Sequence, residues 1–399
     1  MDFYRHWFFG TSSQRPLTFF LVYLVSIVFT FQSLLVAYSS STYLEQFSAA
    51  KFVGLIYAAA AFLAIVITLL LPSILNKFGN VNTSITLMVL LSLLYIIIGF
   101  APNPTTTILA FILSMAISPQ IYFNIDIFLE TLIGNEEGTT GSKRGLILAL
   151  MSLASFFSPL AMGYIIGDSN NLGGVYYVGA IIGLVFIAIV LARFRQFYDP
   201  TYNLIKIKSL FSGVFANINI NTVLTTQFLL QFFYTWAIIY FPLYLATTIG
   251  FSWETIGQII AVGLFAFVIF EYPIGIIADR HIGEKEMMAL GFVVLALCAA
   301  SMTFFVGATI ISWMVLMFIS RFGASLVEVT TESYFFKQVT GNDTNLISLF
   351  RLMRPLANLL GAIMGSISLI FLPINYIFIV LALVMVSGAF ITQRLTDTK

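Results

Sequence analysis

Residues 271–285, which read Glu-Tyr-Pro-Ile-Gly-Ile-Ile-Ala-Asp-Arg-His-Ile-Gly-Glu-Lys, decide how the rest of the chain is organised. Within this stretch one apolar segment ends, the chain turns at Asp279 and Arg280, and another apolar segment begins near Met287. A weaker copy, Asn76-Lys77-Phe78-Gly79, ends an apolar segment 203 positions earlier. Two loops of one kind at matching places indicate that the chain is built from two related halves.

Other positions keep nearly the same offset. Lys51 and Gly54 correspond to Glu254 and Gly257 at an offset of 203, and Asp126, Glu130 and Gly163 correspond to Glu328, Glu332 and Gly365 at an offset of 202. One ungapped match of this kind can arise by chance. Three matches that change register by a single residue favour a duplicated chain.

The run Gly275-x-x-x-Asp279-Arg280, followed by Gly283 and Lys285, resembles the cytoplasmic loop signature of the major facilitator superfamily. It has one residue more than usual between Arg280 and Gly283. The resemblance covers essentially the whole chain. It implies an all-α polytopic membrane protein with 12 transmembrane helices, arranged as two pseudo-symmetric six-helix bundles that rock around a central site.

The composition agrees with a membrane protein. Hydrophobic residues make up 60% of the 399 residues, charged residues make up 9%, and the mean hydropathy is +1.00. A soluble domain does not need so much apolar surface, whereas this length holds about a dozen spans of ~20 residues. The net charge of +1, without a basic tract, gives no sign of a nucleic-acid partner.

The apolar runs predict two sets of six helices. The expected ranges are 17–43, 51–74, 81–101, 105–130, 144–166 and 172–192, then 219–249, 254–277, 286–308, 311–337, 344–370 and 373–392. The first run is too long for a signal-peptide core and is expected to be retained. A polar connector, 193–218, separates an N-terminal bundle, 1–192, from a C-terminal bundle, 219–399.

Positive charges predict the orientation. If the amino terminus is cytoplasmic, fourteen lysines and arginines fall in inner segments and only Lys51 falls in an outer loop. Such a bias sets topology strongly. Both termini are therefore expected to be cytoplasmic.

Soluble-type catalysis is not expected. The chain has two histidines, one cysteine, and no metal-ligand spacing or nucleophile motif. We expect no enzyme activity, no catalytic residue, no cofactor and no metal. Ionisable groups inside the membrane remain as candidates, because they are costly and usually functional or paired.

Two acidic pairs, Asp126/Glu130 and Glu328/Glu332, have the i, i+4 spacing that places each pair on one helix face. The family resemblance implies that Glu130 and Glu332 latch the inner loops through ion pairs. The residues expected to act in gating are Asn76, Lys77, Glu130, Gly275, Asp279 and Arg280. Asn76 replaces the usual aspartate, so the first latch is expected to be the weaker one.

Glu328 and Asp126 lie a turn deeper, on helices that line the central cavity in this superfamily. A desolvated carboxylate there suits proton coupling, and Glu328 is the leading candidate. The alternative for each is a buried structural pair.

Three arginines lie within helices of the second half. Arg351 and Arg354 are about as deep as Glu328, so a salt bridge to it is plausible, and with Glu271 and Glu332 they are expected to form a charge network. Arg321 has no counterpart in the first half and favours a fork for an anionic group of the substrate. The alternative for Arg321 is a place in the same network.

Neutral polar residues complete the expected substrate-binding set, because they are expensive to expose to lipid. They are Gln32, Gln120, Asn124, Gln227, Gln231 and Tyr234. Each could instead form an interhelical hydrogen bond. Trp236, Tyr240 and Tyr244 are expected to pack towards lipid, because aromatic residues are 16% of the chain. The alternative is that they form an aromatic wall of the cavity.

The run Ser155-x-x-Ser158-Pro159-x-x-x-Gly163 loosely resembles a motif of the family's antiporters and favours export. The sequence therefore predicts a monomeric, proton-coupled secondary transporter that exports a small organic solute across a cell membrane, expected to be a bacterial inner membrane. Its partners are the solute, protons and membrane lipids. The alternatives are uptake of an anionic metabolite through Arg321, or a lipid-moving or sensor protein on the same scaffold.

Overall fold

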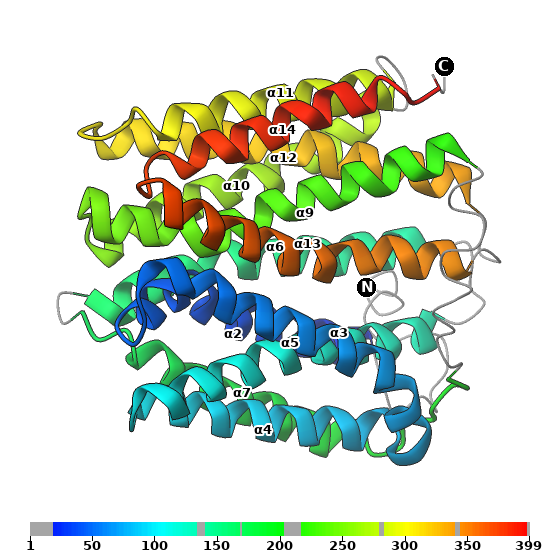
Figure 1. The fold of residues 1–399 in the computed structure, drawn as a ribbon. Helices are drawn as coiled ribbons and strands as arrows, with labels where there is room; N and C mark the ends of the chain where they lie inside the picture. The colour runs from blue at the N-terminus through cyan, green and yellow to red at the C-terminus, as the bar shows by residue number, and fades with distance from the viewer. Residues whose placement is uncertain are drawn as a thin grey trace, which may run out of the picture. The chain divides into compact units, whose positions relative to one another are not determined.

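A computed structural model describes residues 19–133, 140–167, 170–202, 217–278, 283–339 and 344–396. In these ranges it holds twelve α-helices and no strand (Figure 1). Those of the first half are α2 (Phe19–Glu45), α3 (Ala50–Phe78), α4 (Asn80–Phe100), α5 (Pro104–Ile133), α6 (Thr140–Ile166) and α7 (Gly174–Arg193). Those of the second half are α9 (Ile218–Tyr244), α10 (Trp253–Ile277), α11 (Glu284–Met302), α12 (Ile310–Gln338), α13 (Thr344–Phe371) and α14 (Ile377–Thr392).

The helix lengths fit a membrane. Among the described residues, eleven helices are long and apolar enough to cross a bilayer, and α14 is a shorter apolar helix of 16 residues. The predicted helices agree with the observed ones except at some ends. The largest difference is at α11, which ends at Met302 rather than near 308, because turns follow and Gly307 takes a left-handed backbone angle, φ 86°.

Polar side chains start several helices of the second half. Asn217 accepts hydrogen bonds from the backbone N–H groups of Asn219 and Ile220 at the start of α9. Ser252 and Thr309 do the same for α10 and α12. Such caps satisfy backbone donors that have no partner inside the helix. They explain why these helices begin where they do.

The contacts between Cα atoms divide the chain into two compact units. Unit 1 is Met1–Ala37 with Phe62–Ile205, and unit 2 is Tyr38–Ala61 with Lys206–Lys399. The end of α2 and the start of α3 therefore belong with the second half. The domain boundaries expected from the sequence remain a prediction.

Helix α9 is the most enclosed span of unit 2. It contacts α12, α13 and α14. Together with the π-helical turn Leu245–Ile249 that follows, it forms one long span, and 83% of the most apolar 18 residues of this span are buried. Trp236, Tyr240 and Tyr244 are 0% exposed, so the expectation that they face lipid was wrong. The indole N–H of Trp236 donates to the carbonyl of Gly361 at 2.9 Å. The hydroxyl of Tyr240 donates to the carbonyl of Ala362 at 2.8 Å. These bonds to backbone carbonyls of α13 explain the burial.

Close packing against α13 depends on a small residue. A Cβ atom placed on Gly365 would lie 2.1 Å from the ring of Tyr240. Real Cβ atoms do not approach other atoms so closely, so any side chain here would push α13 away from α9. Small residues allow this kind of helix approach inside membranes.

Candidate functional site

A hydrogen bond between α9 and α12 forms the centre of the candidate site. The hydroxyl of Tyr234 on α9 donates to Oε2 of Glu328 on α12 at 2.6 Å. The ring of Tyr234 also packs edge-on against Phe267 of α10, with 6.2 Å between the ring centroids. A hydrogen bond to an ionised carboxylate is roughly twice as strong as one between neutral groups. The bond therefore links α9 to α12 through the carboxyl group of Glu328.

Two further carboxylates lie close to Glu328, and we call the three residues Glu271, Glu328 and Glu332 the carboxylate cluster. Glu271 comes from α10, and the other two come from α12. Glu271 interacts electrostatically with both Glu328 and Glu332. Three ionised carboxylates within reach of one another repel, and a proton taken up by the cluster relieves that repulsion.

Two arginines of α13 lie beside this cluster. The Nε of Arg354 donates to Oε1 of Gln231 on α9 at 3.0 Å, and Arg354 and Arg351 both interact electrostatically with Glu332. Among the described residues, no ion pair within 4 Å joins Glu328 to either arginine. The expected salt bridge is not formed, because Tyr234 holds Glu328 and Gln231 holds Arg354.

Arg321 on α12 is enclosed in a different way. Its side chain is only 2% exposed, and its guanidinium lies over the rings of Phe233 and Tyr234, at 5.4 and 5.8 Å from their centroids. Aromatic faces attract a cation by about 0.5–2 kcal/mol. Burying an ion without a partner of opposite charge costs several kcal/mol, so the rings offset only part of the cost.

The expected polar residues of the first half take part in bonds between helices. Gln32 Nε2 donates to the carbonyl of Gly179, at 2.8 Å. Gln120 Nε2 donates to Thr68 Oγ1 and to the carbonyl of Ala64, at 3.0 and 3.2 Å. Asn124 Nδ2 donates to Ser84 Oγ at 3.1 Å. These contacts support the alternative interpretation, in which the three residues pack helices together.

The acceptor atoms of some polar residues remain available. Oε1 of Gln32, Oδ1 of Asn124 and Oε1 of Gln227 are buried without a hydrogen-bond partner. Gln227 and Gln231 are 7% and 4% exposed. Asp126 and Glu130 lie one turn apart on α5 with exposed side chains. The expected roles of the glutamines and Asn124 in substrate binding, of Asp126 in proton coupling and of Glu130 in gating remain predictions.

The loop that contains Asn76 and Lys77 is held by a residue that the sequence analysis missed. Oδ1 of Asp199 accepts hydrogen bonds from the backbone N–H of Asn80, at 2.7 Å, and from the hydroxyl of Tyr202, at 2.5 Å. Asn76 Nδ2 donates to the carbonyl of Tyr202 at 2.9 Å. An anion at the first residue of α4 complements the helix dipole.

Two features support this latch. Gly79 has φ 76°, and a Cβ atom there would lie 2.6 Å from Oδ2 of Asp199, so only glycine fits. Burial, the hydrogen bond to Asp199 and the charge of Asp199 raise the pKa of Tyr202, so its hydroxyl remains a donor. The sequence signal was a carboxylate just beyond the last helix of the first half, next to Pro200.

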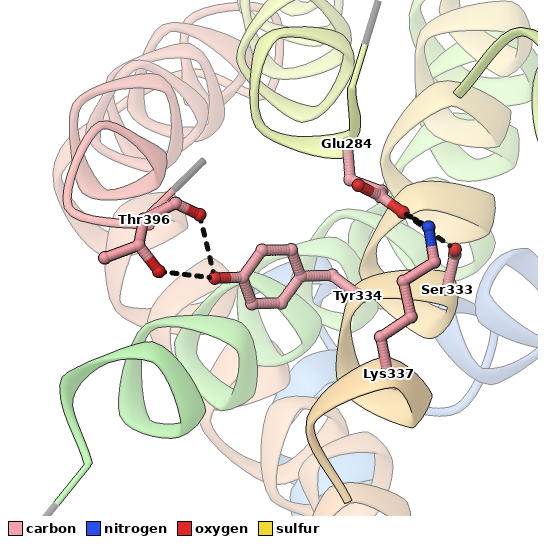
Figure 2. Close-up of polar contacts among 5 residues, drawn as sticks. All are labelled: Glu284, Ser333, Tyr334, Lys337 and Thr396. Atoms are coloured by element: carbon pink, nitrogen blue, oxygen red, sulfur yellow. Dashed lines mark hydrogen bonds and ion pairs between the residues drawn. The ribbon is translucent and has the colours of Figure 1, made fainter. Parts of the chain in front are cut away.

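The matching loop in the second half is partly outside the described residues, which do not include Asp279 and Arg280. Figure 2 shows what lies beside it. Glu284, in the first turn of α11, is 1% exposed, forms an ion pair with Lys337 of α12, and accepts a hydrogen bond from Ser333 at 3.1 Å. Glu332, the expected latch, lies in the carboxylate cluster, and the loop that it is expected to hold lies outside the described residues. Glu284 follows Gly283 directly, and that position was the available sequence signal.

The end of the chain is fixed to the same side of unit 2. Tyr334 donates to the carbonyl of Thr396 at 3.0 Å (Figure 2), and Asn219 Nδ2 donates to Thr396 Oγ1 at 2.8 Å.

In the described part of the chain, no group of three or more histidine, cysteine or acidic side chains is placed to hold a metal ion.

Comparisons with solved structures identify the fold. The crystal structure of the nucleoside transporter NupG aligns with a TM-score of 0.69 at 12% identity, covering 94% of this chain and 98% of NupG. A POT family transporter, crystallised in complex with a thioalcohol-conjugated peptide, aligns with a TM-score of 0.71 at 13% identity, covering 94% of each chain. At these identities the likeness concerns the fold alone. No curated protein sequence matches the chain significantly.

The family model of the Major Facilitator Superfamily matches residues 21–339 and 223–398, which together span nearly the whole sequence. The twelve described helices and the loop signature ending in Asp279 and Arg280 agree with this match. The chain is therefore a multi-pass membrane protein that belongs to the Major Facilitator Superfamily of transporters.

Proposed function

We propose that this protein is a proton-coupled secondary transporter that exports a small organic solute, with Glu328 as its main proton-carrying group. The observation that carries the proposal is the hydrogen bond from Tyr234 to Glu328 beside two further carboxylates. A proton relieves the repulsion within the carboxylate cluster. Ionisable groups inside a membrane span are costly, so a cluster of them in a transporter marks a candidate site of proton exchange.

Coupling requires that the proton changes the balance between two conformations. Tyr234 binds ionised Glu328 more strongly than protonated Glu328, so protonation loosens the bond between α9 and α12. Arg351 and Arg354 interact electrostatically with Glu332, so their positive charges partly offset the negative charge of the same cluster. Asp126 occupies the corresponding place in the first half and is the second candidate.

Access is controlled at the inner loops. Asn76, Lys77 and Glu130 act in the first loop and Gly275, Asp279 and Arg280 in the second, as the superfamily resemblance implies. Both termini lie in the cytoplasm. The protein works as a monomer in a bacterial inner membrane.

One observation supports export, and another supports an organic molecule as the solute. The antiporter-like run lies on α6, where Ser158 Oγ bonds to the carbonyl of Ala154 at 2.6 Å and Pro159 follows inside the helix. Among the structural relatives, one is named as a nucleoside transporter and another as a POT family transporter. Gln227 supplies a polar contact to the solute, because its Oε1 is buried without a partner. Gln231 lies one turn further along α9 and offers its amide N–H groups, since its Oε1 accepts from Arg354.

The test is transport by the purified protein in liposomes that enclose a pH-sensitive dye. A panel of labelled nucleosides, dipeptides, organic acids and organic cations is added, with the lumen acidic, alkaline or at the external pH. Antiport predicts that an acidic lumen drives at least one solute inwards and that the lumen becomes more alkaline. Symport predicts the opposite gradient dependence, which would contradict export. A solute that moves without any proton movement would contradict proton coupling.

A further inference from the structure

Arg321 is a buried cation that has no hydrogen-bond acceptor and no ion-pair partner in the described part of the chain. Its side chain is 2% exposed, its Nε is sealed from solvent without a hydrogen-bond acceptor, and no described side chain or carbonyl accepts a bond from its guanidinium. The alkyl stem packs at α10, because a Cβ atom on Gly263 would lie 3.3 Å from Cγ of Arg321. The stem is thus packed against α10, and the N–H donors of the guanidinium have no acceptor among the described residues.

The neighbours of this guanidinium are aromatic. Phe233 and Tyr234 present their ring faces to it, and Tyr38 is close enough to interact with it electrostatically. Glu328 lies seven residues further along α12, but its carboxylate accepts the bond from Tyr234. The site therefore offers one positive charge, a fixed set of donors and apolar walls.

We propose that Arg321 binds the carboxylate of an organic monoanion whose remaining part is aromatic or aliphatic. This inference rests on the proposed function, since it names the class of solute carried. A guanidinium fork matches both oxygens of a carboxylate. A doubly charged group fits less well, because Arg321 is the one cation at these rings among the described residues, and Tyr234 also contacts the carboxylate of Glu328.

The experiment measures thermal stabilisation of the detergent-purified protein at one neutral pH. The probes are benzoate, phenylacetate, hexanoate and octanoate, each paired with its methyl ester. The proposal expects at least one acid, and not its ester, to raise the melting temperature in a saturable way. Arg321→Lys keeps the charge without the fork and is expected to weaken binding by on the order of tenfold.

Arg321→Met separates binding from structure. It removes the unpaired buried charge, so the ligand-free variant is expected to melt at a higher temperature than the wild type while the shift by acids disappears. If Arg321 only stabilised the fold, Arg321→Met would melt at a lower temperature than the wild type. Arg193→Lys, at the exposed end of α7, is the matched control and is expected to respond to acids like the wild type.

Several results would overturn the inference: no stabilisation by any of the acids, equal stabilisation by acids and esters, or acid binding by Arg321→Met with wild-type affinity. Because binding is measured without a gradient, the outcome is independent of proton coupling. A protein that binds acids through Arg321 but moves no protons refutes only the proposed coupling. A proton-coupled protein whose solutes bind normally to Arg321→Met refutes only the acid site.

Discussion

Tyr234 and Glu328 join α9 to α12 through a 2.6 Å hydrogen bond, in which the phenol donates to the carboxylate. Arg321 lies over the ring of the same tyrosine, 5.8 Å from its centroid. Tyr234 therefore contacts both the proposed proton carrier and the proposed anion site. The single side chain of Tyr234 thus connects the carboxylate of Glu328 with the guanidinium of Arg321.

Tyr234→Phe removes the hydroxyl and leaves Glu328 without this donor. We expect transport driven by a pH gradient to fall several-fold in reconstituted liposomes, because the bond no longer changes with the charge of Glu328. Solute exchange without a gradient is expected to continue. Losing a hydrogen bond to a charged group costs about 1.5–3 kcal/mol, so the variant should also melt at a lower temperature.

Tyr240→Phe is the matched control for that change. Its hydroxyl bonds to the carbonyl of Ala362 rather than to a carboxylate, so its loss is expected to lower stability by about 0.5–1.5 kcal/mol without altering coupling. Equal coupling defects in both variants would show that the Tyr234 hydroxyl has no special part in coupling.

The Glu284–Lys337 ion pair is expected to respond unequally to removal of its two members. The side chain of Glu284 is 1% exposed, whereas that of Lys337 is 45% exposed. Lys337→Met leaves a buried carboxylate with less compensation and is expected to cost up to about 3 kcal/mol. Glu284→Gln leaves a lysine whose half-exposed side chain is already in contact with water, so its cost is expected to be smaller.

Thermal unfolding in detergent, at low and high salt, measures both variants. The double variant is expected to be more stable than Lys337→Met alone. If Glu284→Gln proves the more damaging single change, the pair is not the main partner of the buried carboxylate.

Asp199→Ala removes the carboxylate at the start of α4. We expect a loss of about 1 kcal/mol, as for other side chains that cap a helix, and faster hydrogen exchange of the Asn80 amide. Glu254→Ala is the control, because it too removes a carboxylate near a helix N-terminus, that of α10, whose cap is supplied by Ser252. Unchanged exchange at Asn80 would mean that water replaces Asp199 without loss.

Most of the helical architecture was predictable from the sequence. Long apolar runs broken by charged loops fix the number of spans, because each span must satisfy its own backbone hydrogen bonds in the bilayer. The pairing at the site was less predictable. The i, i+4 spacing put Glu328 and Glu332 on one face of α12, but it could not show that Tyr234 and Gln231 of α9 reach Glu328 and Arg354 first.

Asp199 and Glu284 were missed for a related reason. Both are exposed-looking carboxylates in loops or first turns, where charges usually face water. Their roles depend on the N-terminus of α4 and on Lys337, which only the folded chain brings to them. Trp236 and Tyr240 were misjudged because composition cannot show which aromatic residues find a buried carbonyl.

The central claim is that Glu328 carries the coupling proton, and transport by Glu328→Gln tests it most directly. Wild type, Glu328→Gln and Asp126→Asn are reconstituted in parallel, and solute accumulation driven by a pH gradient is compared with gradient-free exchange. The account predicts that Glu328→Gln loses pH-driven accumulation and still exchanges solute. Full pH-driven accumulation by Glu328→Gln, together with its loss in Asp126→Asn, would contradict the account and place the coupling site on α5.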